Sequence, residues 1–268
     1  MKELIKRVFG DKAITLFGII PFSACRVINR RKLDSLGFLP KVCITFAIPY
    51  YAGEFEGRNL SRYAVARDYH LYAASLRDQL TEELTQLFPE NRFEVFADNS
   101  PVDERDAAVK CGVGIRGKNG LVITEDYGSY IFLGEVLSDL SPEIFPSLSV
   151  CEERFCEGCG KCLAACPKKN ICLSALTQKK GDLTPEEEGE ILALGSCWGC
   201  DICQEVCPHN RGVAFTPIGF FREVLIPRLD EKTLAAMSDG AFSERAYSWR
   251  GRKTVLRNLL LLEKEKTE

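Results

Sequence analysis

The chain has 13 cysteines, and their spacing points to chemistry more directly than any other feature of the sequence. One run over 156–167 reads C-x2-C-x2-C-x3-C-P, and a second run over 197–208 repeats that spacing. In such paired runs, three thiolates of each run bind one iron–sulfur cube and the fourth binds the other cube. A zinc ribbon, with its two C-x2-C pairs, leaves the third cysteine and the proline unexplained. The two runs therefore predict two 4Fe–4S clusters.

Length and composition limit the remaining possibilities. With 268 residues, of which 46% are hydrophobic, the chain can form one large domain or two modest ones with a full core. A net charge of -3 and a pI near 5.7 argue against a generally basic surface, so any RNA contact must come from a local basic patch. The cysteine spacing, the charged opening over 1–7 and the lack of an apolar run of about 20 residues predict a cytoplasmic protein without a signal peptide or membrane span.

Apolar runs that end at proline or aspartate alternate with stretches of helical periodicity in the first half of the chain. This alternation indicates a layered α/β architecture, which is followed by the cysteine-rich segment and a helical tail. The expected helices cover 1–9, 22–36, 59–88 and 103–111, and the expected strands cover 13–20, 41–48, 93–97, 121–123 and 128–137.

Glycines crowd the segment 112–134, and 112–117 formally matches G-x-G-x-x-G. A dinucleotide fingerprint should follow a strand and open a helix, whereas this segment follows a predicted helix and leads into a predicted strand. The glycines therefore indicate backbone that passes close to a large ligand or to itself, rather than a nicotinamide site.

One basic concentration stands out near the end of the chain, where cationic residues alternate with aromatic ones. Arginine beside aromatic side chains suits phosphate contact and base stacking, so the stretch is a candidate RNA contact. The alternative is a solvated helix face, and the two interpretations stay open on the sequence. The residues are Arg245, Arg250, Arg252, Lys253 and Arg257, with Tyr247 and Trp249 between them.

Six motifs extend beyond simple cysteine spacing. They are S-R-Y-A-V-A-R-D-Y-H at 61–70, D-N-S-P-V-D-E-R at 98–105, C-G-V-G-I-R-G-K-N at 111–119, G-S-Y-I-F-L-G-E at 128–135, C-L-S-A-L-T at 172–177 and W-G-C-D-I-C-Q-E-V-C-P at 198–208. Together they resemble the signatures of the epoxyqueuosine reductase family, and those outside the clusters are not shared with simple ferredoxins. The C-terminal helical repeat region of the family's larger members has no counterpart here, so the resemblance is to a short form.

The resemblance implies a cobalamin-dependent enzyme that reduces epoxyqueuosine to queuosine in transfer RNA, with electrons from two 4Fe–4S clusters. It also implies an α/β (α+β) corrinoid-binding catalytic domain over 1–148, a bacterial-type two-cluster ferredoxin-like domain over 149–212 and a C-terminal helical tail over 213–268. An epoxide oxygen leaves as water only when an acid protonates it. Asp98 matches the family's acid and is the predicted catalytic residue. The alternative is a turn residue that hydrogen-bonds its own backbone.

The cluster ligands follow from the same resemblance. Spacing alone makes Cys197 the first cysteine of the second run, whereas the family match gives its role to Cys172, which we favour. One cluster would then be bound by Cys156, Cys159, Cys162 and Cys207, and the other by Cys166, Cys172, Cys200 and Cys203. The remaining thiols, Cys25, Cys43, Cys111 and Cys151, would be small buried hydrophobic residues.

Expected contacts to the corrin rest on motif matches. They are Tyr63, Asp98, Lys118, Asn119, Val122, Leu133 and Ser174, of which Val122 and Leu133 could act only through backbone or packing, or be ordinary core residues. The D-Y-H at 68–70 lacks the glycine of a D-x-H-x-x-G motif, so we expect no protein histidine on cobalt.

The implied partners are transfer RNA carrying epoxyqueuosine, bound by Arg250, Arg252, Lys253 and Arg257, and an electron-donor protein of ferredoxin or flavodoxin type. Two other functions stay open. One is a related corrinoid iron–sulfur reductase of a small molecule. The other is a non-catalytic two-cluster electron-transfer module, which would need neither Asp98 nor the glycine-rich segment.

Overall fold

The structure is a computed structural model that describes residues 2–146, 148–167 and 171–264. The chain forms two compact units that each draw on three stretches of sequence. Unit 1 comprises Met1–Tyr50, Tyr72–Gly160 and Cys207–Ile218, and unit 2 comprises Tyr51–Leu71, Lys161–Val206 and Gly219–Glu268. These units divide the chain differently from the three consecutive domains predicted above.

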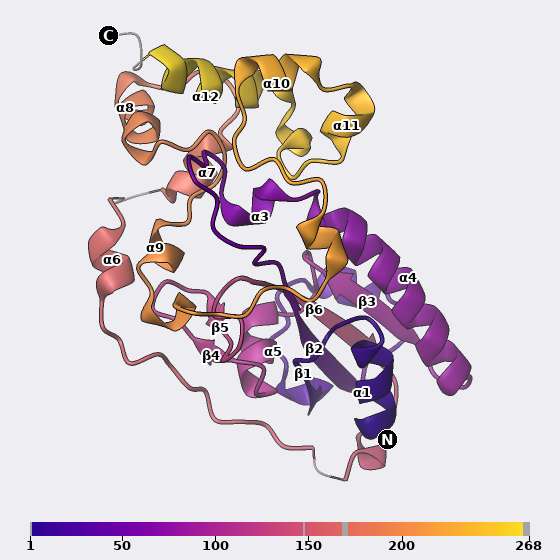
Figure 1. The fold of residues 1–268 in the computed structure, drawn as a ribbon. Coiled ribbons are helices and arrows are strands. Elements are labelled where there is room, and N and C mark those ends of the chain that lie inside the picture. The colour runs from indigo at the N-terminus through magenta and orange to yellow at the C-terminus, as the bar shows by residue number, and fades with distance from the viewer. Residues whose placement is uncertain (1, 147, 168–170, 265–268) are drawn as a thin grey trace. The chain divides into compact units, whose positions relative to one another are not determined.

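Unit 1 is built on a four-stranded sheet in the order β1-β2-β6-β3 (Figure 1). Every neighbouring pair is antiparallel, and every residue of the central strand β2 is buried. The mixed α/β class is therefore confirmed, with strand directions that the alternating pattern did not specify. The strands are β1 (Phe17–Pro21), β2 (Val42–Pro49), β3 (Phe93–Ala97) and β6 (Ile131–Ser138), and a separate hairpin is formed by β4 (Ile115–Arg116) and β5 (Val122–Ile123).

Helices cover both faces of this sheet (Figure 1). On one face, α1 (Lys2–Gly10) packs Phe9 against Phe46 of β2, with ring centroids 5.1 Å apart. The long α4 (Tyr69–Leu87) lies on the same face and buries leucines at helical spacing along one side. The opposite face is covered by α5 (Glu104–Lys110).

The face under α5 carries an unusual residue for a sheet interior. Thr45 of β2 and Phe96 of β3 pair directly with Glu135 of β6, so their three side chains share one face. Phe96 packs with Ala107 of α5, which identifies this face as the one that α5 covers. Glu135 is fully buried there.

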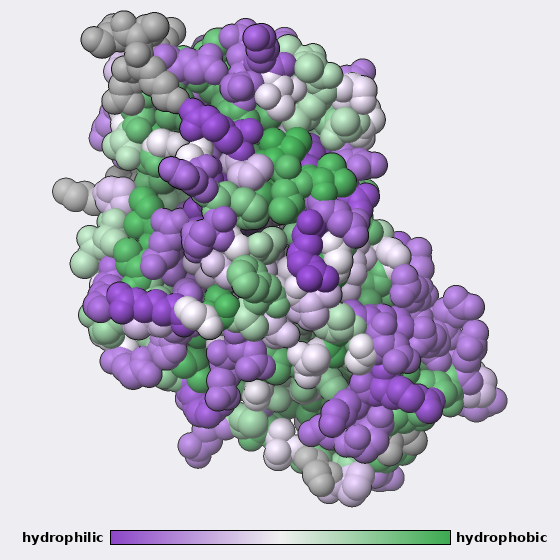
Figure 2. Space-filling model, viewed as in Figure 1, coloured by the Kyte–Doolittle hydropathy of each residue, from purple (hydrophilic) through white to green (hydrophobic). Residues whose placement is uncertain are grey.

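Unit 2 is helical, and its core surrounds Trp198 and Tyr247, whose rings meet edge to face at 6.2 Å. Within the described ranges, no helix combines the length and apolar character that crossing a membrane requires. In Figure 2, apolar and polar residues are interspersed over the face in view. The helices are α3 (Arg62–Val65), α6 (Lys161–Ala165), α7 (Leu173–Thr177), α8 (Pro185–Leu194), α9 (Ile202–Glu205), α10 (Glu231–Ala236), α11 (Asp239–Ser243) and α12 (Arg252–Lys264).

The single helix predicted over 59–88 is wrong, because the chain breaks between α3 and α4. Ala66 is extended, with φ −79° and ψ −175°. The carbonyl group of Val65 accepts hydrogen bonds from the Arg245 guanidinium at 2.5 Å and from the Ile226 N–H at 2.9 Å. These partners lie far along the chain, so local periodicity could not reveal the break.

Two smaller predictions also need correction. The helix over 22–36 is a 3₁₀ turn at Phe22–Ala24 followed by the short α2 (Arg30–Asp34), whose N-cap is Asn29. The first strand starts at Phe17 rather than 13, because Ala13 has a positive φ of 58° that ends the turn after α1.

Candidate active site and cluster ligands

Cys166, Cys172, Cys200 and Cys203 all belong to unit 2. Burial raises the pKa of the Cys203 thiol to about 11, and Cys200, Cys172, Cys166 and also Cys162 raise it further by charge repulsion. Burial likewise raises the pKa of Cys200 to about 11, again with contributions from Cys172 and Cys166. Among the residues that the structure describes, no group of three or more such side chains is assembled to hold a metal ion, so a cube bound by these four thiols stays a prediction.

Local hydrogen bonds hold the loops of this set. The N–H of Gly199 donates to Thr177 Oγ1 at 2.9 Å, which connects the turn before Cys200 to the C-L-S-A-L-T helix α7. Gly199 has φ 75°, and a Cβ there would overlap Ser61 Oγ, so no larger residue fits this turn. Asn258 of α12 donates to the carbonyl groups of Thr177 and Cys197 at 2.7 and 2.9 Å.

Cys197 lies outside this set. Its side chain is fully buried in the apolar cluster around Trp198, and its thiol donates to the Asn59 carbonyl group at 3.2 Å. Burial raises its pKa to about 12, and no other cysteine contributes to that shift. Cys172, by contrast, is exposed at the N-cap of α7.

Three of the other predicted ligands belong to unit 1. The N–H of Cys156 donates to the Arg116 carbonyl group of β4 at 3.0 Å, which ties the first cysteine loop to the β4–β5 hairpin. Glu157 and His209 are paired at 2.7 Å, which brings the loop of Cys156 and Cys159 to the segment that follows Cys207. The fourth predicted ligand of this set, Cys162, is in α6 of unit 2.

A charged network supports the second cysteine run and was missed in the sequence. Asp201 is buried between two arginines: its Oδ2 accepts from Arg58 Nη1 and from the Arg62 N–H, each at 2.7 Å. Glu205 Oε1 accepts from Arg58 Nη2 at 2.6 Å and from Arg62 Nη1 at 2.7 Å. The S-R-Y motif therefore fixes the W-G-C-D-I-C-Q-E segment, a link that only the fold reveals.

Asn210 is a second residue whose role the sequence did not reveal, and its side chain holds the G-S-Y motif by hydrogen bonds. Its Oδ1 accepts from the Ser129 N–H at 2.7 Å, and its Nδ2 donates to Ser129 Oγ at 2.9 Å. Gly128 has φ 55°, and a Cβ there would overlap Asn210 Oδ1. The backbone of the glycine-rich segment thus passes close to another part of the protein. Of the two explanations given for the glycines, this one is the close approach of the chain to itself rather than to a ligand.

Asp98 directly follows β3 and is exposed at the end of the sheet. It has φ 71° and Asn99 has φ 54°, so two consecutive residues other than glycine adopt left-handed backbone. The Asn99 N–H donates to Asp98 Oδ1 at 2.8 Å, and Lys32 Nζ donates to the Asn99 carbonyl group. The self-bonding turn of the alternative interpretation is therefore present, and it leaves the carboxyl group of Asp98 at the surface.

Two further carboxyl groups lie behind Asp98. Burial and the charge of Asp98 raise the pKa of Glu104 to about 7, although Glu104 also accepts a hydrogen bond from the Asp98 backbone. Burial and the charge of Glu104 raise the pKa of Glu135 well above its usual range. Both residues occur in the motifs quoted above, but nothing in the sequence indicated that they would meet.

The end of the sheet beside Asp98 is apolar and partly open. Ala97 pairs with Gly134, so Asp98 and Leu133 extend from the same end of β3 and β6. Leu133 is half-buried and packs against the apolar cluster that includes Val122 of β5. One predicted corrin contact, Leu133, therefore lies near Asp98.

The other predicted corrin contacts are more dispersed. Lys118 is exposed on the β4–β5 turn, with Nζ about 3.9 Å from the Cβ position of Gly158 in the first cysteine loop. Asn119 accepts from the Leu121 N–H at 3.2 Å and shapes that turn. In unit 2, Tyr63 accepts a hydrogen bond from Trp198 Nε1 at 2.9 Å, and Ser174 accepts one from Gln178 at 3.3 Å.

Much of the predicted RNA contact is engaged within unit 2. Arg245 is buried; Arg252 donates to the carbonyl groups of Leu234, Met237 and Ser238. Arg257 donates to the carbonyl groups of Lys179 and Gly181. Lys253 is exposed, and Arg250 lies 3.7 Å over the exposed Trp249 ring.

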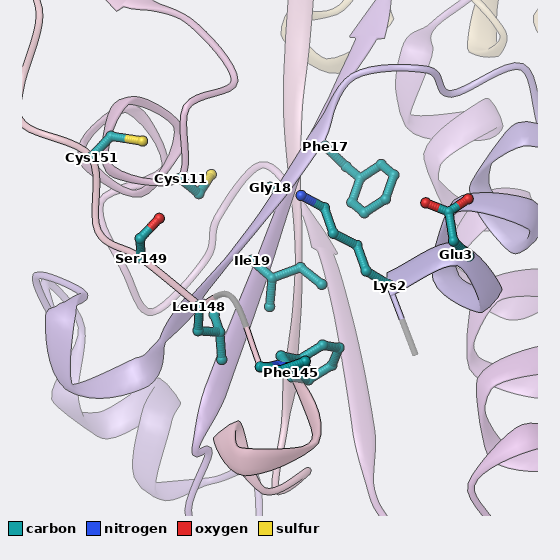
Figure 3. A pocket seen from close by; sticks show the side chains of 11 residues that line it. Lys2, Glu3, Phe17, Gly18, Ile19, Cys111, Phe145, Leu148, Ser149 and Cys151 are labelled. Atoms are coloured by element: carbon teal, nitrogen blue, oxygen red, sulfur yellow. The ribbon is translucent and has the colours of Figure 1, made fainter.

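The pocket shown in Figure 3 lies elsewhere in unit 1, beside the edge strand β1, and has a volume of about 380 Å³. Phe17, the start of α1 and the loop before Cys151 line it, together with Cys111. None of the predicted catalytic or corrin-binding residues lines this pocket. The prediction that Cys151 is buried is wrong, because this cysteine is exposed.

Comparison with known proteins finds relatives over most of the chain. The 4Fe-4S dicluster domain model matches residues 155–211. An epoxyqueuosine reductase of Listeria monocytogenes is 36% identical over 214 residues, which cover 73% of this chain and 54% of that protein. The chain thus spans about half the length of the curated relatives it matches.

Solved structures show the same fold. The structure of epoxyqueuosine reductase from Streptococcus thermophilus superposes with a TM-score of 0.81 at 24% identity, covering 100% of this chain and 82% of that chain. A crystal structure of epoxyqueuosine reductase with an epoxyqueuosine-modified tRNA stem loop gives 0.78 at 27% identity, covering 97% and 80%. By sequence and by fold, the chain belongs to the epoxyqueuosine reductase family.

Proposed function

We propose that the protein reduces epoxyqueuosine to queuosine in transfer RNA. The observation that carries this proposal is the 36% identity to a protein named epoxyqueuosine reductase over 73% of the chain. The similarity to a reductase solved with an epoxyqueuosine-modified stem loop supports the same substrate. An exposed carboxyl group at the end of the sheet provides the acid that must protonate the epoxide oxygen before this oxygen can leave as water.

We assign the second cluster to Cys166, Cys172, Cys200 and Cys203 from the motif match, and the fact that all four belong to unit 2 supports this choice. The burial of Cys197 in an apolar core and its bond to Asn59 support leaving it out of this set. The first cluster takes Cys156, Cys159, Cys162 and Cys207, as the motif match indicates. The two clusters would pass electrons from a ferredoxin- or flavodoxin-type donor.

The corrin would lie at the apolar end of the sheet beside Asp98, where Leu133 packs against the apolar cluster that includes Val122. Bound cobalamin would supply the strong nucleophile and reductant that the protein's own side chains lack. Asp98 would donate the proton to the departing oxygen, and its left-handed turn keeps the carboxyl group exposed for that purpose. Tyr63, Lys118, Asn119 and Ser174 complete the proposed cofactor contacts.

Histidine is not expected on cobalt. His70 is paired with Asp68 at 2.8 Å and His209 with Glu157 at 2.7 Å, and these are the chain's two histidines. A carboxylate-paired histidine can also serve as a metal ligand, so this point needs its own measurement. Electron paramagnetic resonance of the cobalt(II) form should show no nitrogen splitting, and His70→Ala should leave the spectrum unchanged. Nitrogen splitting that disappears in His70→Ala would contradict the proposal.

The direct test is anaerobic. The clusters of the full chain are reconstituted, cobalamin is added, and unbound cofactor is removed. The protein then receives a chemical reductant and a stem loop that carries epoxyqueuosine. Retained corrin and formation of queuosine, detected by mass spectrometry of nucleosides, are the expected result. Intact clusters without retained corrin would instead favour the electron-transfer module.

One observation favours a second candidate, the reduction of a small molecule. Arg252 and Arg257, two of the four residues predicted to contact RNA, donate to carbonyl groups within unit 2. Retained corrin with no measurable binding of the stem loop would support this alternative.

A further inference from the structure

The buried carboxyl groups behind Asp98 have no role in the proposed function as stated. Glu135 is fully buried in the centre of the sheet, and among the described residues neither of its carboxyl oxygens has a hydrogen-bond partner with good geometry. The Ser100 hydroxyl is close enough to lower its pKa, but burial outweighs that effect. The Oε1 atom of Glu104 is also buried without a partner.

Glu135 is neutral at neutral pH, and Glu104, with a pKa of about 7, keeps its proton in a large fraction of the molecules. An ionised carboxylate without partners in a protein interior is so costly that the group keeps its proton instead. The charged groups that act on Glu104 are Asp98, Glu135, Arg105 and Lys32. The two cations do not offset burial and the neighbouring carboxyl groups. Glu104 and Glu135 therefore store protons next to Asp98, which is the acid of this group that faces the surface.

The proposed reaction needs more protons than Asp98 holds. Both carbon–oxygen bonds of the epoxide break, two electrons arrive from the clusters, and the oxygen leaves as water, which takes up two protons. A single carboxylic acid supplies one proton and is then a carboxylate that must be protonated again. A site covered by a corrin and a bound RNA would restrict the approach of bulk water to that carboxylate.

We propose that Glu104 and Glu135 are a proton reservoir for Asp98. Glu104 transfers its proton to the Asp98 carboxylate, directly or through one water, and Asp98 then delivers the second proton to oxygen. Glu135 holds a further proton in reserve. Solvent returns the lost protons to these carboxyl groups between turnovers. This inference rests on the proposed function and adds Glu104 and Glu135 as positioning residues that act through Asp98.

Infrared spectroscopy tests the stored protons without any cofactor. The full chain should show carbonyl stretching bands of buried protonated carboxyl groups at neutral pH. Glu135→Gln should remove one band, and Glu104→Gln should remove another that fades as the pH rises through about 7. Glu90→Gln, which alters an exposed carboxylate just before β3, is the control and should change neither band. Absence of both bands in the unaltered chain would overturn the reservoir.

Turnover tests the transfer itself. In the reconstituted protein, Glu104→Gln should lower kcat by about 10- to 100-fold with KM nearly unchanged, and it should remove the fall of kcat above neutral pH. Glu135→Gln should act in the same direction but less strongly. Turnover with an unchanged pH profile in both variants would overturn this inference alone. Absence of turnover in the unaltered chain would overturn the proposed function and, with it, the reservoir.

Discussion

Asp98 holds a backbone conformation that side chains other than glycine rarely adopt, and it does so beside a second such residue. Left-handed backbone costs roughly 1–2 kcal/mol per residue, so the turn persists only because its surroundings hold it. Glu104 bonds the Asp98 backbone, and Lys32 bonds the carbonyl group of Asn99. The cost is consistent with a carboxyl group that must face outward from the end of a strand.

Replacing this acid tests its role. Asp98→Asn keeps the size and the local hydrogen bond but cannot donate an acidic proton. The rate of queuosine formation should fall by about 100-fold or more, while the visible spectrum of bound cobalamin stays the same. Asn99→Asp, which alters the neighbouring exposed residue, should leave the rate within a few-fold of the original. Equal activity of Asp98→Asn and the unaltered protein would remove Asp98 from the mechanism.

The choice between two cysteines is also a question of single residues. Cys172→Ser should lower the iron content from about eight to about four atoms per chain, because one cube loses a ligand. Cys197→Ala should keep both clusters, since its thiol lies in an apolar core. Iron analysis and the visible spectrum of the anaerobically reconstituted proteins give the answer. Full iron in Cys172→Ser, with loss in Cys197→Ala, would reverse the assignment.

At the scale of elements, the first turn of α5 places a titratable side chain, Glu104, beside the acid that follows β3. The pKa of Glu104 is raised from 4.5 to about 7, so the folded protein binds this proton more tightly than the unfolded chain does. Its contribution to stability is fully present below about pH 4.5 and is lost as the pH rises through about 7.

Glu104→Gln should therefore reduce the loss of stability over this pH range by about 1–3 kcal/mol. Urea unfolding of the cofactor-free protein, followed by far-ultraviolet circular dichroism at several pH values, measures the difference. Glu90→Gln is again the matched control. Parallel pH profiles for Glu104→Gln and the original chain would show that the folded carboxyl group titrates normally.

The break between α3 and α4 depends on one buried side chain. Arg245 donates to the carbonyl groups of Val65 and Val224, and its guanidinium lies over the Tyr247 ring at 5.8 Å. Arg245→Met fills similar space but leaves the buried carbonyl group of Val65 without that donor, at a cost of about 2–4 kcal/mol. The fluorescence of the buried Trp198 should report earlier unfolding in urea. Arg222→Met, at an exposed arginine, should have little effect, and equal midpoints for the two variants would contradict this role.

Elements were predictable from the sequence where their cause is local. The strands at 41–48 and 93–97 appear almost as predicted, because an apolar run and its stop signal are both contained in the segment. The broken helix, the Asp201 network and the meeting of Glu104 with Glu135 depend on partners far along the chain. The cysteine runs were readable because ligand spacing is itself a local property.

At the scale of the whole molecule, the chain joins a sheet-based unit to a helical one, and the candidate RNA contact belongs to the second. With Arg252 and Arg257 bonded internally, Arg250 and Lys253 are the members of that set best placed to meet a phosphate. The stacked Trp249 and Arg250 would also suit an unpaired base.

The combined change of Arg250→Ala and Lys253→Ala should weaken stem-loop binding and reduce the slope of log affinity against log salt by roughly 1–2. Lys180→Ala, at another exposed cation of unit 2, controls for the loss of charge alone. Fluorescence anisotropy with a labelled stem loop at several salt concentrations measures both quantities. An unchanged slope would place RNA recognition elsewhere.

The division of each unit among three stretches also sets an order for biosynthesis. Residues Tyr51–Leu71 leave the ribosome early, yet the unit they join includes Gly219–Glu268. The early stretch must therefore wait, with apolar residues such as Leu60 uncovered, until the segment that contains Val255 and Leu259 has been made. Cys207, the last of the proposed ligands, emerges late as well. Iron–sulfur insertion into the proposed ligand sets would then follow the synthesis of Cys207, and so would come after most of unit 1 has been made.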